Sequence, residues 1–292
     1  MNQLKTLGLL ALLSGILVAV GQAIGGPSGA TFGLVMAAVM NLGSWFYSDR
    51  LALSAYRAQP VTPAQAPQLH AMVQRLSQRA DIPMPAVYIV PSQAANAFAT
   101  GRDPEHAAVA VTEGILRMLP EDELEGVLAH ELSHIINRDT LTQAVAATVA
   151  GAISWLSQMA FFFGGSRDSE GGNPIAMLAS VLIAPIAASV VQMGISRTRE
   201  FAADEGAARL TGNPRALANA LHRLEAGARS VSLGGNPAYQ PLLIMNGPKR
   251  NFLANLFSTH PATGDRIERL LSLEQDLGTS ANRMGGFRQF AR

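Results

Sequence analysis

The stretch Glu121–Asn137, EDELEGVLAHELSHIIN, decides how this chain is interpreted. Pro120 precedes it and three acids occupy its first turn, where the positive end of a helix dipole favours them, so we predict a helix. Its second half places His130 and His134 four residues apart, with Glu131 between them. At 3.6 residues per turn the two imidazoles are offset by only about 40° around the axis, so they can bind a single metal ion.

The residue types available limit which metal this helix could bind. The chain contains no cysteine, so histidine and carboxylate side chains must supply the ligands of any transition metal. Zinc needs a third protein ligand and an open position for water, and Glu131 would lie close enough to act as a base on that water. The alternative is a solvated helix face whose two histidines bind nothing. The pattern favours a hydrolase with one Zn²⁺ per chain.

The third ligand should be another histidine or a carboxylate from a neighbouring element. His70, His106 and His222 lie in segments with no obvious second function. Glu200 and Asp204 form the stronger pair, because at helical spacing they share a face. One of them could bind the metal while the other accepts the second ring N–H of a ligand imidazole. The alternative for this pair is a solvated acidic face.

Long stretches without a charged residue surround these motifs, at 6–48, 140–166 and 171–196. Each is long enough for a helix across a bilayer, which needs roughly 20 mainly apolar residues. The first stretch divides at GGPSGAT, so we predict four membrane-spanning helices in two hairpins, over 1–48 and 140–196. The four apolar runs are Leu7–Ile24, Thr31–Tyr47, Ala144–Phe163 and Ile175–Ile195. The alternatives are a cleaved signal peptide for the first run and a buried pair of helices in a soluble core for the last two.

The flanking charges predict the orientation of these hairpins. Basic residues gather on the side of the chain termini, at Lys5, Arg50, Arg57, Arg138, Arg197 and Arg199. By the positive-inside rule, both termini face the cytoplasm of a multi-pass protein, such as one of the bacterial inner membrane. Segments 49–139 and 197–277 would then meet as one discontinuous cytoplasmic domain, with a flexible tail over 278–292. The near balance of 22 basic and 21 acidic residues gives no reason to expect a nucleic-acid partner.

The polar segments predict a small sheet among several helices. Ala86–Val90, AVYIV, is a β-branched and aromatic run between two prolines, and Val109 and Val111 alternate in a second run. Apolar residues at helical spacing predict helices over 63–80 and 263–277, and Asn213 followed by Pro214 predicts the start of another. The fold class is therefore an α+β membrane protein, predominantly helical, with a small β-sheet.

Several motifs occur together in one order along the chain. HELSHIINRD, followed by two apolar runs and then SRTREFAADEGAA, resembles the HtpX family of integral-membrane zinc metalloproteases within the gluzincin group. NAFATG at Asn96–Gly101 and LFSTHPATGDRIERL at Leu256–Leu270 are also similar to that family's pattern. The resemblance covers nearly the whole chain. It implies a gluzincin-like zinc endopeptidase that acts on polypeptides, among them misfolded or damaged membrane proteins, in membrane protein quality control.

The resemblance also implies roles for single residues. Glu200 would be the third metal ligand, and Asp204 would orient a ligand histidine, His130. His260 and Arg266 match the late motif, where they would stabilise the oxyanion or hold nearby structure; taken alone, His260 before a proline would be a loop residue. An edge strand for pairing with an extended substrate is implied at Asn96, Ala97, Phe98, Ala99 and Thr100.

Two other classes of function compete with the protease. A metal transporter would carry ionisable ligands inside its membrane spans, where such groups mark ion paths. The four predicted spans contain no His, Asp or Glu, which argues against it. A catalytically silent zinc-binding membrane scaffold differs from the protease only in activity. The sequence predicts no oligomeric state.

Overall fold

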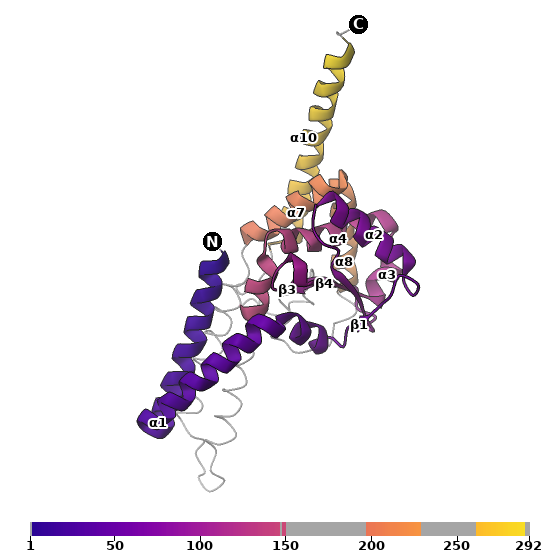
Figure 1. Cartoon of the computed structure of the whole chain (residues 1–292). Helices are drawn as coiled ribbons and strands as arrows, with labels where there is room; N and C mark the ends of the chain where they lie inside the picture. The colour runs from indigo at the N-terminus through magenta and orange to yellow at the C-terminus, as the bar shows by residue number, and fades with distance from the viewer. Residues whose placement is uncertain (1, 147, 150–196, 229–260, 290–292) are drawn as a thin grey trace, which may run out of the picture.

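The computed structural model describes residues 2–146, 148–149, 197–228 and 261–289 (Figure 1). This part of the chain is mostly helical, with one four-stranded sheet. Its helices include α1 (Asn2–Ala55), α2 (Pro67–Arg79), α3 (Glu113–Met118), α4 (Glu121–Ile136), α7 (Arg197–Thr211), α8 (Pro214–Ala228) and α10 (Thr263–Gln289), and residues 139–146 are also helical. Its strands are β1 (Gln59–Pro60), β2 (Ala86–Val90), β3 (Ala97–Gly101) and β4 (Ala107–Thr112).

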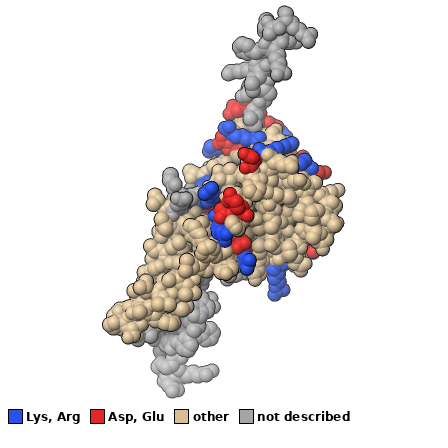
Figure 2. All heavy atoms as spheres, viewed as in Figure 1, with Lys and Arg blue, Asp and Glu red and all other residues tan. Residues whose placement is uncertain are grey.

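Helix α1 consists of two halves that fold back on each other as an arm of the molecule (Figure 1). The chain turns at Gly25 and Gly26, which have non-helical dihedral angles. The halves pack so closely that a Cβ atom on Gly21 would lie 2.1 Å from the carbonyl oxygen of Gly29, so glycine is required there. On the face shown in Figure 2, this arm is free of the charged side chains that gather on the globular part.

Only part of the predicted membrane region can be compared with the structure. Among the described residues, Gly25–Tyr47 is the one helix long and apolar enough to cross a bilayer, and the run Thr6–Gln22 is shorter. Residues 150–196, which contain most of the third run and all of the fourth, lie outside the described residues. The four-span topology therefore stays a prediction.

The sheet has the strand order β1-β2-β4-β3, with β2 parallel to β4 and the other two pairs antiparallel. Strand β2 coincides with the predicted run AVYIV, and β4 contains the predicted valines. Strand β3 lies at one edge of the sheet and begins one residue after Asn96.

Both faces of this sheet are buried. Val109 and Val111 face a core shared with α2, α4 and α8. Ala108 and Ala110 face the end of α1 instead, where Tyr56 packs with Phe98 of β3. The alternation in the sequence therefore separates two buried faces, and the sheet is held between the end of α1 and the helical layer that contains α4.

Helix α10 differs from its predicted extent. The sequence predicts a helix that ends at 277 and a flexible tail over 278–292, whereas α10 continues to Gln289 and forms the projection at the C-terminal end in Figure 1. No proline follows Pro261 to block the helix, and the glycines at 278, 285 and 286 weaken it without forbidding it once its first turns are fixed in the domain. Leu270, which is fully buried, fixes those turns.

Candidate metal centre

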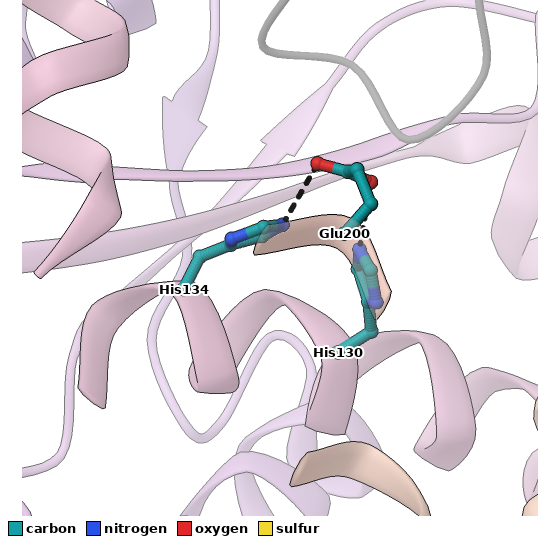
Figure 3. Close-up of side chains that lie close together, drawn as sticks. All are labelled: His130, His134 and Glu200. Carbon is teal, nitrogen blue, oxygen red and sulfur yellow. Dashed lines mark ion pairs between the residues drawn. The ribbon is translucent and has the colours of Figure 1, made fainter. Parts of the chain in front are cut away.

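Three donor groups converge at the centre of the globular part. His130 and His134 project from α4 toward the carboxylate of Glu200 on α7 (Figure 3). Nε2 of His130 lies 3.7 Å from one oxygen of Glu200, and Nε2 of His134 lies 3.6 Å from the other. All three side chains are buried, and one donor atom from each lies within 4.8 Å of the others. The helical spacing thus places both imidazoles beside the same carboxylate, as the sequence predicted.

The distances between these donors suit a bound metal ion better than hydrogen bonds. Hydrogen bonds from nitrogen to oxygen have lengths of about 2.7–3.2 Å, and the two separations exceed that range. Ligands at about 2.0–2.1 Å from a tetrahedral zinc ion would lie about 3.4 Å apart, close to what is seen. Two imidazoles with one carboxylate also form a donor set typical of catalytic zinc, so the residues fit the ion.

His130 is oriented by a buried ion pair. Its Nδ1 lies 2.9 Å from Asp204, which carries the carboxylate predicted to orient a ligand histidine. Arg266 donates two hydrogen bonds, of 2.7 and 2.8 Å, to the same carboxylate. Burial acts to raise the pKa of Asp204, but the charge and hydrogen bonds of Arg266 hold it below its usual value. With Nδ1–H donated to Asp204, the Nε2 lone pair faces the metal position.

Arg266 contacts the donor groups from α10. Its Nη1 atom lies 3.8 Å from a Glu200 oxygen, and its side chain is buried. Of the two roles suggested for Arg266, holding nearby structure is the one that these contacts support.

His134 has its own carboxylate partner, which the sequence analysis missed. Nδ1 of His134 lies 3.2 Å from Asp139, and Arg199 lies 3.4 Å from the other oxygen of Asp139. Burial alone would lower the pKa of His134, but the hydrogen bond to Asp139 and the nearby carboxylates raise it to about 9. His134 must lose this proton from Nε2 to bind a metal. The signal was present in HELSHIINRD, where an acid follows the second histidine by five residues.

Glu131 is fixed beside the donor groups by the sheet. Its Oε2 atom accepts a hydrogen bond of 2.8 Å from the backbone N–H of Ala99 in β3. Burial raises the pKa of Glu131 above its usual value against the opposing effect of the two imidazoles. A raised pKa makes a carboxylate a stronger base than an exposed one, which suits a general base.

The other predicted site residues lie in different places. Asn96, Ala97, Phe98, Ala99 and Thr100 are all buried, and Ala99 is the member that contacts Glu131. Nε2–H of His70 donates to the Val61 carbonyl at 2.8 Å, His106 pairs with Asp103, and His222 is exposed, so none of these three joins the donor groups. His260 lies outside the described residues, and its role stays a prediction.

Comparison with known proteins identifies the family. The model of peptidase family M48 matches residues 63–274, a range that contains every described donor group. The chain belongs to peptidase family M48. Members of this family are metallopeptidases, so the predicted enzyme class is confirmed. The alternative of a metal transporter is not supported.

Relatives within the M48 family match almost end to end. A protein named Protease HtpX homolog from Trichormus variabilis is 66% identical over 287 residues, covering 96% of this chain and 99% of the relative. A Protease HtpX homolog from Ralstonia pickettii is 50% identical over 279 residues, covering 94% and 97%. The resemblance to the HtpX family is therefore confirmed.

The fold also occurs in a solved structure. The crystal structure of S. mikatae Ste24p superposes with a TM-score of 0.52 at 19% identity. The match covers 92% of this chain but only 65% of Ste24p. The two proteins thus share a fold although few of their aligned residues are identical.

Proposed function

We propose that this chain is a membrane-embedded zinc endopeptidase with its site on the cytoplasmic side. The observation that carries the proposal is the position of Glu131, held by the Ala99 N–H beside the buried His130, His134 and Glu200 donor set. Zinc bound there would polarise the scissile carbonyl and lower the pKa of a water molecule. Glu131 would accept the proton of that water and pass it to the leaving amine.

The edge strand β3 supports the proposed substrate class. An extended peptide can add to an open sheet edge by backbone hydrogen bonds, as in other peptide-binding proteins. The N–H of Ala99 already donates to Glu131, and the N–H of Ala97 donates to the Asn96 side chain at 3.0 Å. Such a peptide would therefore pair with the remaining groups of this edge. The bound peptide would lie directly beside Glu131.

The apolar arm supports a membrane location and substrates that reach the membrane. Gly25–Tyr47 is long enough to span a bilayer, and the end of α1 packs directly on the sheet that contains β3. A site tied to the membrane surface in this way suits the cleavage of misfolded or damaged membrane proteins. This favours a role in membrane protein quality control, with lipid and polypeptide as partners.

A single substitution tests the proposed chemistry. Glu131→Gln keeps the size and hydrogen-bond acceptor of the side chain but removes its ability to take up a proton, so cleavage of casein should fall by at least about 10²-fold. Zinc content, measured by elemental analysis, should stay at one ion per chain. Glu225→Gln, an exposed change on α8, is the matched control. A Glu131→Gln protein that cleaves casein at the unmodified rate would refute the mechanism.

A further inference from the structure

A hollow of about 520 Å³ lies where α1 meets the residue that follows β3. One face of α1 supplies most of its lining at helical spacing, and Arg102 closes it from the sheet side. The residues from α1 are Val39, Leu42, Gly43, Phe46, Tyr47 and Arg50. Binding pockets for small molecules commonly enclose about 300–1,000 Å³, so the hollow has room for part of a lipid.

The hollow has apolar walls and a cationic end. Leu42, Phe46 and Tyr47 are 60%, 52% and 52% exposed, so no described part of the chain covers them. The guanidinium of Arg50 lies 5.5 Å from the centre of the Tyr47 ring, and that of Arg102 lies 5.5 Å from the centre of the Phe46 ring. Cation–π attraction thus holds both charges at the same end of the apolar surface.

The cationic end keeps a net positive charge. Asp103 lies 3.3 Å from Arg102 and offsets one of the two guanidinium groups. Arg50 has no ion pair within 4.0 Å among the residues that the structure describes. Its chain neighbour Asp49 projects to a different side of the helix, because adjacent residues of a helix do not face each other. A phosphodiester, with one negative charge, would complement this end.

Gly43 opens the middle of the apolar wall. A Cβ atom placed on Gly43 would meet nothing within 4 Å, so no neighbouring atom requires a glycine at this position. Gly33, about three turns nearer the hairpin bend, differs because its Cβ would lie 2.4 Å from a backbone oxygen of Leu17. Glycine destabilises a helix interior relative to alanine. What Gly43 provides is therefore open space along the helix, where an acyl chain would fit.

We propose that this hollow binds an anionic phospholipid, with its phosphate between Arg50 and Arg102 and an acyl chain along the Gly43 face of α1. Anionic lipids are enriched in the cytoplasmic leaflet, the side on which the positive-inside rule places both arginines. The inference rests on the proposed insertion of α1 into a bilayer. The lipid would join α1 to the end of β3, and β3 positions Glu131 through Ala99. The membrane surface would then help to hold the edge strand of the site.

Native mass spectrometry of the full-length protein in dodecyl maltoside tests this site. Phosphatidylglycerol should be retained in preference to phosphatidylcholine added at the same concentration. Arg50→Gln and Arg102→Gln should each weaken phosphatidylglycerol binding about fivefold, the usual contribution of one basic residue near an anionic lipid. Gly43→Leu should also weaken it by filling the hollow. Gly15→Leu is the matched control, because a Cβ there likewise meets nothing within 4 Å and lies away from the hollow.

The results that overturn the proposal are distinct from those that overturn membrane insertion. Equal retention of the two lipids, or unchanged phosphatidylglycerol binding by both glutamine variants, would refute the lipid site. So would a Gly43→Leu protein whose KM for a membrane-protein substrate rises while its lipid binding is unchanged, since the hollow would then hold substrate. Extraction of the unmodified protein from membranes by alkaline carbonate would refute insertion itself. If a glutamine variant fails to fold, Arg50→Lys serves as a second test. It keeps the positive charge and should therefore retain phosphatidylglycerol.

Discussion

Replacing Arg266 with methionine should destabilise the protein far more than the loss of one surface charge. Arg266 is 2% exposed and Asp204 is 1% exposed, and two hydrogen bonds of 2.7 and 2.8 Å join them. Methionine fills much the same space but leaves the Asp204 carboxylate buried without its cation. Breaking a buried ion pair on one side costs about 3–5 kcal/mol. For a chain of this size that corresponds to a fall in melting temperature of about 10 °C.

The effect should depend on pH in a defined direction. In the unmodified protein Arg266 holds the pKa of Asp204 below its usual value of 3.8, so this contribution to stability is present above about pH 4 and fades only below it. In the variant, burial acts without the arginine and raises the pKa of Asp204 instead. The folded variant then binds a proton that the unfolded chain does not, so its stability rises as the pH falls. The gap between the two proteins should narrow from pH 7 toward pH 5.

Thermal unfolding in detergent, with chelator present to remove effects of metal, measures this difference. Arg215→Met is the matched control, because Arg215 also forms a paired contact with a carboxylate, Glu274 of α10, but at the surface. The control should change the melting temperature far less, since exposed ion pairs contribute little. If both variants lose the same few degrees, or if the Arg266→Met gap does not change with pH, the reasoning about the buried pair is wrong.

Further predictions concern the metal ligands and the edge strand. Asp139→Ala should weaken zinc binding about 10–100-fold in chelator competition, and Asp139→Asn should weaken it less because its amide oxygen still accepts from His134; equal losses would contradict the hydrogen-bond role. Gly101→Ala should lower the melting temperature, because its φ is 132° and a Cβ would lie 2.2 Å from the His106 carbonyl oxygen. Chelation should abolish cleavage and zinc should restore it; activity unaffected by chelator would exclude a metal-dependent reaction.

Local periodicity predicted much of the site because helices place residues at fixed angles. His130 with His134, and Glu200 with Asp204, are each four residues apart, and each pair shares a helix face in the structure as expected. The run AVYIV likewise predicted β2, since its β-branched residues lie between two prolines. In each case the prediction depends only on residues that are close together in the sequence.

Contacts between distant segments could not be predicted from the sequence in the same way. The hydrogen bond from Ala99 to Glu131 depends on how β3 packs on α4, which no spacing along the chain encodes. The alternating valines of β4 predicted a sheet, but not that both faces of that sheet are buried. Ala108 and Ala110 are small residues that occur both at exposed and at buried positions. An alanine side chain in a strand therefore does not indicate which face of the sheet is buried.

The Asp139–Arg199 contact explains how a metal centre can be divided by a long apolar insertion. His134 precedes residues 140–196 and Glu200 follows them, so the ligands are far apart in the chain. Asp139 and Arg199 flank the insertion and lie 3.4 Å apart, which brings its two ends together beside His134. Because the entropy cost of closing a loop rises only logarithmically with its length, added length in the inserted segment costs the site little. The same Asp139 carboxylate lies 3.2 Å from Nδ1 of His134, so the contact that links the two ends of the insertion also helps to align a ligand imidazole.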